Sequence, residues 1–443
     1  MSPLHSEMNP SDTIVAISSA TGASARMIVR ASGPLAHDLA RQLTNIVDPS
    51  PAAASRVSLH FAGLVVPAWL YAFGAPRSYT GDDLVEFHVP GNPLLVRMLL
   101  DHLRSSGARD AGPGEFSARA FFNGRVDLTE AEGVAATIAA HGEDELAAAR
   151  QLMAGELARR LRPVMDAVAE TLALVEVGID FSDEDVTFLP AAQVRARAAD
   201  ADAALNRLLA DSARFERLAH EPTVVLIGRP NAGKSTLLNA LAGRRRAVTS
   251  PVAGTTRDVL SAEVALGRGM VKLLDVAGLE TCDTTTADPI GRQMRDRALR
   301  AAAEADVVVM VHDVTDPAPP PDVGRPADLV VRTKSDLLPA GTHDDLAVSA
   351  HTGEGLPALR ERLDRVAFGE RSTRPSLALN ARHVAAVAEA RAALGRVSGG
   401  ADASPEVVAL ELREALDALG RVVGAVTPDD LLGRIFSTFC IGK

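Results

Sequence analysis

A glycine-rich loop between an apolar strand and an apolar helix start constrains the fold of this chain more than any other feature. Residues 223–227 read Thr-Val-Val-Leu-Ile, residues 228–235 read Gly-Arg-Pro-Asn-Ala-Gly-Lys-Ser, and Thr-Leu-Leu follows at once. This pattern is typical of the strand, G-x-x-x-x-G-K-S loop and helix of a P-loop domain. In such a loop backbone N–H groups surround the phosphates, Lys234 bridges the β- and γ-phosphates, and the Ser235 hydroxyl ligates Mg²⁺. We expect the phosphate contacts to come from Asn231, Ala232, Gly233, Lys234, Ser235 and Thr236.

Two further motifs follow the loop in the order that a nucleotide hydrolase requires. Residues 254–258 read Gly-Thr-Thr-Arg-Asp and supply Thr256, which can close on Mg²⁺ and the γ-phosphate as part of a switch loop. Residues 273–278 read Leu-Leu-Asp-Val-Ala-Gly. Asp275 is expected to lie behind the Mg²⁺ ligands, and Gly278 can offer its N–H to the γ-phosphate.

The next motif predicts which base the domain binds. Residues 330–336 read Val-Val-Arg-Thr-Lys-Ser-Asp, so Thr333, Lys334 and Asp336 end another apolar strand. The Asp336 carboxylate can accept hydrogen bonds from N1–H and N2–H₂ of guanine, a donor pair that adenine does not present. A turn at Ser349-Ala350 is expected to close over guanine O6. The sequence therefore predicts a GTPase.

The residues that would orient the attacking water differ from those of Ras-like proteins. Leu279 follows the Asp-x-x-Gly motif, where a Ras-like protein carries a glutamine, and it cannot hydrogen-bond. The acidic candidates before the next helix are Glu280, Asp283 and Asp288. Asn231 either holds a monovalent cation beside the phosphates, where an arginine finger would otherwise place its charge, or merely favours the turn. The residues alone leave both alternatives open.

The 443-residue chain is too long for one hydrophobic core and predicts several domains. Short strands are expected at 13–17 and 27–30, with alternating strands and helices to about residue 117. Residues 128–177, 191–218 and 376–443 have the apolar spacing of long helices, and residues 315–328 read as a surface loop. We predict an α+β N-terminal domain at 1–120, an α-helical central domain at 121–220 and 371–443, and an inserted α/β P-loop GTPase domain at 221–370.

Composition bears on partners and location. The formal net charge of −11 argues against nucleic-acid binding over the whole surface, so any RNA contact must be local or shared with a partner. No apolar run approaches the roughly 18 residues of a membrane span. The first ten residues lack the basic and apolar segments of a secretion signal, and Cys282 and Cys440 are the only cysteines. These features predict a cytoplasmic protein with no membrane partner.

Several further stretches resemble the MnmE (TrmE) family of tRNA-modification GTPases, and the match covers nearly the whole chain. The most specific are residues 431–443, which end in the family's C-I-G-K tail, and Ala-Gly-Thr-Thr-Arg-Asp-Val-Leu at 253–260. Residues 79–83, 113–121 and 179–181 are also similar. The resemblance implies a folate-binding N-terminal domain that dimerises, a helical domain and an inserted, potassium-stimulated GTPase domain.

The resemblance also implies partners and a reaction. Such a homodimer forms a heterotetramer with the FAD-dependent protein MnmG and acts on tRNA. Together they add an aminomethyl-type group, such as carboxymethylaminomethyl, to C5 of wobble uridine 34. The one-carbon unit comes from a tetrahydrofolate derivative.

Site residues follow from the same resemblance. The family's folate pocket maps onto Arg30, Glu86, Arg125 and Lys443. Arginines suit carboxylates or ring acceptors, and a glutamate suits the donor edge of a pterin, although each residue alone reads as a solvated surface charge. The family's potassium site maps onto Asn231, Ser250, the carbonyl of Val252 and Thr255.

The sequence departs from the family pattern at three places. Residues 18–25 replace a glycine-rich turn near Arg30. Thr333 stands where the family carries Asn, which removes an amide that would brace the P-loop. Asp288 aligns with the family's water-orienting Glu and is one methylene shorter, so slower hydrolysis is expected. Within the matching tail, Cys440 is either a nucleophile or a packed small residue.

An RNA-assembly GTPase of the Era type is the alternative function. Such a binding switch shares the GTPase domain but should carry a basic RNA-binding module after it. Here the chain after residue 368 reads as helical and is not strongly basic. This favours the tRNA-modification enzyme.

Overall fold

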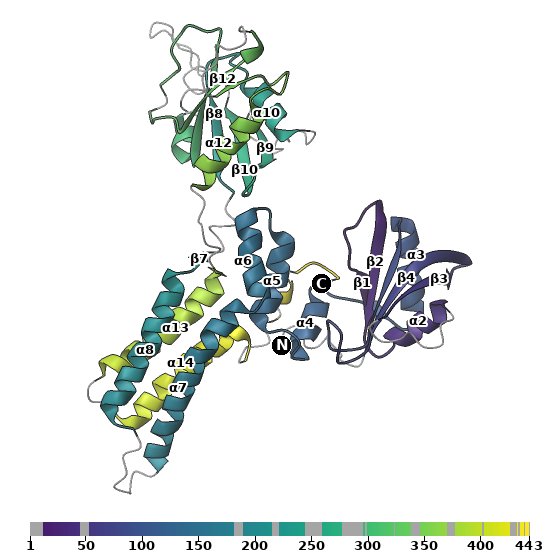
Figure 1. Cartoon of the computed structure of the whole chain (residues 1–443), viewed down its shortest axis with the longest axis vertical. Coiled ribbons are helices and arrows are strands. Elements are labelled where there is room, and N and C mark those ends of the chain that lie inside the picture. The colour runs from purple at the N-terminus through teal and green to yellow at the C-terminus, as the bar shows by residue number, and fades with distance from the viewer. Residues whose placement is uncertain are drawn as a thin grey trace. The chain divides into compact units, whose positions relative to one another are not determined.

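The structure, a computed structural model shown in Figure 1, consists of two compact units. One unit contains residues 1–138, 149–212 and 377–443, and the other contains residues 139–148 and 213–376. The second unit is inserted in the first, as the sequence predicted. The structure describes residues 12–44, 53–180, 189–214, 221–243, 259–276, 296, 299–322, 324–337, 346–369, 377–400, 403–425, 432, 435–437 and 439–442.

The first unit begins with a six-stranded sheet covered on one face by two helices (Figure 1). The strand order is β3-β4-β5-β2-β1-β6, antiparallel throughout except where β6 pairs with β1. Met27, Val29 and Phe87 pack against the leucines of the two helices. Because side chains alternate along a strand, Arg30 and Glu86 lie on the opposite face. The elements are β1 (Ile14–Ile17), β2 (Ser24–Ser32), α2 (Ala36–Thr44), β3 (Ala53–Phe61), β4 (Leu64–Phe73), β5 (Leu84–Gly91), α3 (Pro93–Ser105) and β6 (Arg109–Asp110).

The remainder of the first unit is helical and contains a buried ionic cluster. Glu132 accepts hydrogen bonds from Arg382 and pairs with His383, each at 2.7 Å. Burial alone would raise the pKa of Glu132, but the hydrogen bond and charge of His383 and the contacts of Arg382 outweigh it and lower the pKa to about 2. Glu132 lies in α5, and Arg382 and His383 lie in the first turn of α13, so these contacts join the two helices. The elements are α4 (Glu115–Phe122), α5 (Leu128–Ala139), α6 (Glu143–Met153), α7 (Glu156–Asp180), α8 (Ala191–Ala210), β14 (Ala378–Leu379), α13 (Ala381–Gly399) and α14 (Pro405–Val423).

The second unit is an α/β domain with a mostly parallel sheet. Its strand order is β13-β12-β11-β8-β10-β9, and only the edge strand β9 runs antiparallel to its neighbour. In such sheets the loops after the carboxyl ends of the parallel strands meet at one edge and form the ligand site. The elements are β7 (Ala213–Arg214), β8 (Thr223–Ile227), α10 (Lys234–Ala242), β9 (Val259–Ala265), β10 (Met270–Val276), β11 (Val307–Asp313), β12 (Leu329–Thr333), η1 (Ser335–Leu337), β13 (Ala347–Val348) and α12 (Leu356–Phe368).

The helical prediction for residues 128–177 is confirmed, and that for residues 191–218 needs correction. The region 128–177 is divided into α5, α6 and α7, which are separated by short turns. The helix expected over 191–218 ends at Ala210, where the Ser212 hydroxyl donates to the Leu208 carbonyl and the two-residue strand β7 follows. The predicted loop at 315–328 has no helix or strand in its described positions. None of the helices in the described ranges has both the length and the apolar character needed to cross a bilayer.

Candidate functional site

The glycine-rich loop lies between β8 and α10, as the sequence predicted. Gly233 has φ +87° and immediately precedes the first residue of α10, Lys234. Asn231 also has a positive φ, +64°, which is uncommon for a residue with a side chain. This backbone turns the loop sharply into the helix N-terminus, where the unpaired N–H groups of a first helical turn favour an anion.

Lys234 is held against this loop. Its side chain is buried, and Nζ donates to the carbonyl oxygens of Gly228 at 3.0 Å and Arg229 at 2.9 Å. Burial lowers the pKa of Lys234, and the negative charge of Asp275 acts in the opposite direction. A cation held here by carbonyl oxygens is placed to exchange those contacts for phosphate oxygens.

Ser235 and Asp275 form the part of the site that suits a divalent cation. The Ser235 hydroxyl donates to Asp275 Oδ2. Oδ1 of the same carboxylate is buried and has no hydrogen-bond partner among the described residues. A hydroxyl beside a buried carboxylate with a free oxygen is a donor set that suits Mg²⁺, either directly or through its waters.

The base-binding end of the site lies after β12. The Thr333 hydroxyl donates to the Ala232 carbonyl in the P-loop at 2.6 Å. The amide that the family carries at this position is absent, but the shorter Thr333 hydroxyl makes a contact with the P-loop in its place. Lys334, with φ +62°, pairs with Asp313 at 2.6 Å.

Asp336 is exposed and faces the turn that begins at Ser349. The Ser349 hydroxyl donates to the Asp336 carboxylate, and this hydrogen bond lowers the pKa of Asp336. Ser349 itself is fully buried, and Gly353 N–H closes the turn by donating to its carbonyl at 2.9 Å, with Ala350 inside that turn. The structure thus brings the predicted base-binding residues together.

Several predicted residues lie outside the described residues. They comprise the switch threonines, the remaining potassium ligands, the glycine of Asp-x-x-Gly, the candidates for orienting water and the C-terminal lysine: Thr255, Thr256, Ser250, Val252, Gly278, Leu279, Glu280, Asp283, Asp288 and Lys443.

A second cluster of charged residues lies on the N-terminal sheet. Arg30 Nη2 is 2.8 Å from Glu86 Oε1, and both side chains are less than one-fifth exposed. His88 Nε2 is 3.1 Å from the other oxygen of Glu86. Burial would raise the pKa of Glu86, but the charge of Arg30 and the hydrogen bonds from His88 and Arg30 outweigh it and lower the pKa.

Two aromatic rings complete this cluster. The Arg30 guanidinium carbon lies 5.7 Å from the centroid of Tyr79 and 5.5 Å from that of Phe116. Tyr79 and Phe116 were part of the sequence stretches that resemble the family, but no role was predicted for them or for His88. The alternation of β5 could have indicated His88, since it shares a face with Glu86 two residues earlier.

The C-terminal tail docks beside this cluster. The Ser18 hydroxyl donates to the Gly442 carbonyl at 2.8 Å, and Arg30 Nη1 approaches the same oxygen at 3.5 Å. Ile441 forms an antiparallel bridge with Pro113, and Gly114 N–H donates to the Cys440 carbonyl at 3.4 Å. The chain therefore brings residues more than four hundred positions apart into one site. The Cys440 residue is exposed, which contradicts its interpretation as a packed small residue.

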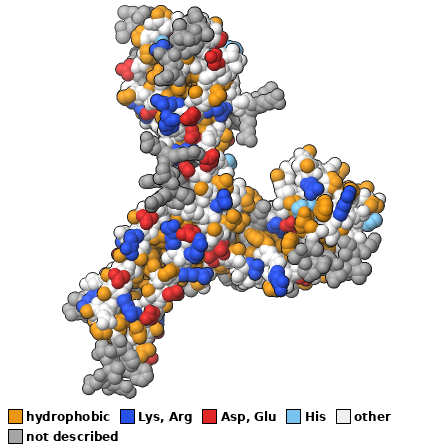
Figure 2. Space-filling model, in the orientation of Figure 1, with side chains coloured by type: hydrophobic (Ala, Val, Ile, Leu, Met, Phe, Trp, Pro, Cys, Tyr) orange, Lys and Arg blue, Asp and Glu red, His pale blue; other side chains and the backbone are white. Residues whose placement is uncertain are grey.

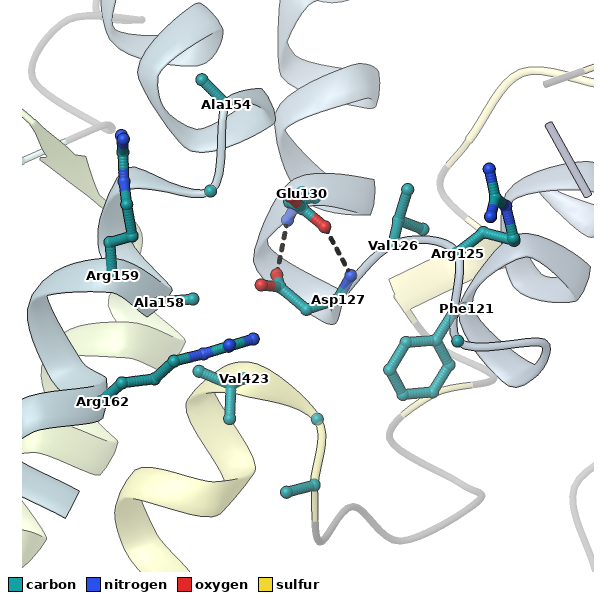
Figure 3. A pocket seen from close by; sticks show the side chains of 14 residues that line it. Phe121, Arg125, Val126, Asp127, Glu130, Ala154, Ala158, Arg159, Arg162 and Val423 are labelled. Atoms are coloured by element: carbon teal, nitrogen blue, oxygen red, sulfur yellow. Dashed lines mark hydrogen bonds between the residues drawn. The ribbon is translucent and has the colours of Figure 1, made fainter. Parts of the chain in front are cut away.

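Arg125 lies apart from the Arg30–Glu86 pair. Within the described part of the chain, no hydrogen bond or ion pair joins its side chain to either residue. Its stem lies beside Gly81, since a Cβ at that glycine would be 3.3 Å from Arg125 Cγ. Arg125 also lines a cavity of about 690 Å³ between α5, α7 and the end of α14 (Figure 3). Arg125 therefore lies beside the segment at Gly81 and contributes to the wall of this cavity.

Comparisons with known proteins cover the whole described architecture. The model described as "GTP-binding protein TrmE N-terminus" matches residues 13–125, and that described as "MnmE helical domain" matches residues 128–440. The tRNA modification GTPase MnmE of Methylobacterium radiotolerans is 41% identical over 454 residues, covering 98% of this chain and 100% of that protein. Its counterpart from Caulobacter vibrioides is 38% identical over 449 residues, with coverage of 98% and 100%. The solved G domain of the T. maritima FeoB iron transporter is 26% identical over 33% of this chain and 99% of its own, with a TM-score of 0.27.

Proposed function

Because this chain belongs to the MnmE family of tRNA modification GTPases, we propose that it modifies the wobble uridine 34 of tRNA at C5. The product carries an aminomethyl-type group, carboxymethylaminomethyl, built from a tetrahydrofolate one-carbon unit. The reaction would be shared with the FAD-dependent partner MnmG. The docked C-terminal tail is the observation that carries this proposal, because it assembles a polar, aromatic-walled site from both ends of the chain.

The proposed folate site is centred on Arg30 and Glu86. The Glu86 carboxylate accepts from donors, and its lowered pKa keeps it ionised at neutral pH, so it suits the amino and N–H edge of a pterin. The half-buried ring of Tyr79 offers a flat surface beside it, and the buried ring of Phe116 packs against the Arg30 guanidinium. Lys443 follows the docked Gly442 directly and supplies a cation for a carboxylate of the ligand. Arg125 binds the glutamate end.

The proposed GTP site uses the predicted residues of the second unit. Lys234 would exchange its loop carbonyls for the β- and γ-phosphates, and Ser235 and Thr256 would hold Mg²⁺ with Asp275 behind them. Asp336 selects guanine, with Ser349 fixing its orientation. A Mg²⁺ ion held there would supply electrostatic stabilisation of the phosphate oxygens. Gly278, Thr333, Lys334 and Ala350 complete the nucleotide contacts.

Hydrolysis is proposed to depend on a potassium ion and on a carboxylate. Asn231, whose left-handed backbone places it at the bend of the P-loop, would hold K⁺ together with Ser250, Thr255 and the carbonyl of Val252. Asp288 would orient the attacking water. Its side chain reaches about one carbon–carbon bond less far than the family's glutamate, so we expect slower hydrolysis.

The proposed domains are 1–120, 121–220 with 371–443, and 221–370. We propose that the N-terminal domain forms the homodimer. The sheet face opposite α2 and α3 carries a stripe of Val65, Pro67, Trp69 and Tyr71 along β4, next to Glu86 and His88 on β5. Val65 is 65% exposed, although it belongs to a strand. An apolar sheet face of this kind suits burial against a second copy. The assembly would act in the cytoplasm on tRNA.

Nucleoside mass spectrometry of tRNA tests the proposed function directly. Cells depleted of this protein should lose the carboxymethylaminomethyl wobble uridine, and the wild-type chain should restore it. A Lys234→Ala chain should fail to restore it, because it lacks the phosphate-binding cation. Unchanged wobble uridine together with accumulating pre-rRNA would contradict the proposal and support an RNA-assembly switch.

A further inference from the structure

The cavity beside Arg125 is distinct from the two sites described so far. Figure 3 shows Arg159 and Arg162 of α7 on one side, Phe121 and Arg125 on the other, and Asp127 with Glu130 between them. Its volume of about 690 Å³ is large enough for several linked residues of a small ligand. All of its lining belongs to the first unit.

The cavity has an excess of available positive charge. Arg125 and Arg162 are exposed, and no ion pair or side-chain hydrogen bond to either is present in the described ranges. Asp127 and Glu130 are engaged with each other's backbone, since Glu130 Oε2 accepts from Asp127 N–H at 2.8 Å and Asp127 Oδ1 accepts from Glu130 N–H at 2.9 Å. Arg159 is partly neutralised by Glu156, with which it forms an ion pair.

Helix α4 connects this cavity to the Arg30–Glu86 cluster. Phe116 at its first turn faces the Arg30 guanidinium, and Phe121 near its last turn lines the cavity. The five-residue step between them corresponds to about 8 Å along a helix. A ligand whose glutamate end is bound by Arg125 would enter the cavity at that residue, because Arg125 is part of its lining.

We propose that this cavity binds the poly-γ-glutamate tail of the folate, with Arg162 and Arg159 binding the carboxylates beyond the first glutamate. This proposal rests on the proposed folate site. It adds that the site selects the polyglutamylated form of folate. Each γ-linked glutamate brings one carboxylate for a guanidinium and one amide N–H for a carboxylate. The cavity offers both partners, since Oδ1 of Asp127 caps α5 while its Oδ2 accepts no hydrogen bond from any described residue.

A polynucleotide is a poorer match for the same residues. Phosphodiesters bind through neutralisation of many charges, whereas here two carboxylates lie between the arginines and the chain carries a net charge of −11. A polyglutamate tail brings an amide N–H with each of its carboxylates, and the two carboxylates of the cavity can accept from these donors, which a phosphodiester lacks. The mixed lining therefore favours polyglutamate.

Calorimetry on the full chain can test this with 5-formyltetrahydrofolate carrying one or five glutamates. We expect the pentaglutamate to bind about tenfold or more tightly, since each added charge-assisted pair contributes a factor of this order. Arg162→Ala should remove most of that preference and leave the monoglutamate affinity unchanged. Alanine keeps the exposed helix position stable, so folding is not at risk.

Arg160→Ala is the matched control. Arg160 lies two residues before Arg162 on α7 and pairs with Glu156 at 2.7 Å, but it does not line the cavity. This variant should keep the wild-type preference for the pentaglutamate. Arg162→Lys should retain part of it, because the charge remains and the forked geometry is lost.

The outcomes separate this inference from the proposed function. If neither folate binds to the wild type, the folate site itself is wrong. If both bind equally, or if Arg162→Ala weakens both by the same factor, the tail does not occupy the cavity. If Arg162→Ala lowers tRNA affinity and leaves the pentaglutamate preference intact, the cavity is a nucleic-acid contact and the inference is overturned.

Discussion

Replacing Gly442 by alanine should undock the C-terminal tail and weaken folate binding. Gly442 has φ +93°, and a Cβ built there would lie 2.0 Å from the Ile17 carbonyl oxygen and 2.9 Å from its carbon. Both atoms belong to the backbone of β1 and cannot rotate away. The alanine variant must therefore shift the tail, which breaks the hydrogen bond from Ser18 to the Gly442 carbonyl.

The size of the effect follows from two contributions. A side chain in the left-handed region costs about 1–2 kcal/mol, and the lost hydrogen bond contributes about 1 kcal/mol. The sum of about 2–3 kcal/mol disfavours the docked tail by roughly thirty- to hundredfold. Once the tail leaves, the ligand loses the cation of Lys443. A shielded charge pair of this kind contributes about 1–3 kcal/mol, so the Kd for folate should rise by about five- to hundredfold.

The assay is calorimetric titration of the full chain with 5-formyltetrahydrofolate. Gly63→Ala is the matched control, because Gly63 has φ +73° in the same unit but nothing within 4 Å of its added Cβ. It should carry the same local strain and leave the folate Kd unchanged. Deletion of residues 442–443 should match Gly442→Ala, and GTP turnover should be unaffected in both. A folate Kd that stays within twofold of wild type in the deletion variant would refute the reasoning and point to a role of the tail in docking the partner protein.

The remaining predictions concern the nucleotide site and the buried ionic cluster. Asp336→Asn should shift preference from GTP toward xanthosine triphosphate, and unchanged selectivity in a turnover assay would contradict the guanine assignment. Thr333→Ala should weaken GTP binding by about two- to tenfold through loss of one hydrogen bond to the P-loop, whereas Thr333→Ser should bind as wild type does. GTPase rate should rise with KCl and not with NaCl at equal ionic strength, and Asp288→Ala should slow hydrolysis with little change in GTP affinity. Since the pKa of Glu132 is lowered to about 2, its stabilisation is present above the unfolded value of about 4.5 and is lost as pH falls toward 2. Denaturant titrations should show about 3 kcal/mol of extra acid destabilisation in the wild type relative to Glu132→Gln, and equal pH profiles would exclude this role.

The fold could be read from the sequence where local patterns are strong. The strand at 223–227 and the helix from Lys234 follow from an apolar run, a glycine-rich turn and an apolar helix start, all within a few residues. The helical character of residues 128–177 was predictable, but the bounds of α5, α6 and α7 were not, because alanine-rich segments continue across the turns. Strand β7 was missed because two residues carry no measurable periodicity.

The sites were only partly predictable. Spacing motifs identified Lys234, Asp275 and Asp336, because each motif is local and the chemistry fixes its residues. The hydrogen bond from Thr333 to Ala232 joins residues about a hundred positions apart. Only the folded structure shows that the Thr333 hydroxyl is close enough to the Ala232 carbonyl to make it. The contact of Ser18 with Gly442 spans 424 positions and leaves no pattern in the sequence.

Residues 139–148 show why the boundary of the GTPase unit differs from any boundary that composition suggests. They read as part of a helical domain, yet they group with residues 213–376. They group with that unit because they contact Arg268, which lies in the turn between β9 and β10. Its guanidinium pairs with Asp144 at 2.8 Å, and its carbonyl oxygen would lie 1.7 Å from a Cβ at Gly142, so only glycine permits this approach.

Helix α6 runs from Glu143 to Met153 and therefore continues through the boundary at residues 148 and 149. In its second half, Met153 N lies 2.2 Å from the position of a Cβ at Gly133, so α6 and α5 also approach as closely as two helices can. Gly142 and Gly133 are therefore two positions at which the absence of a side chain permits a close backbone approach, one against Arg268 and the other against Met153.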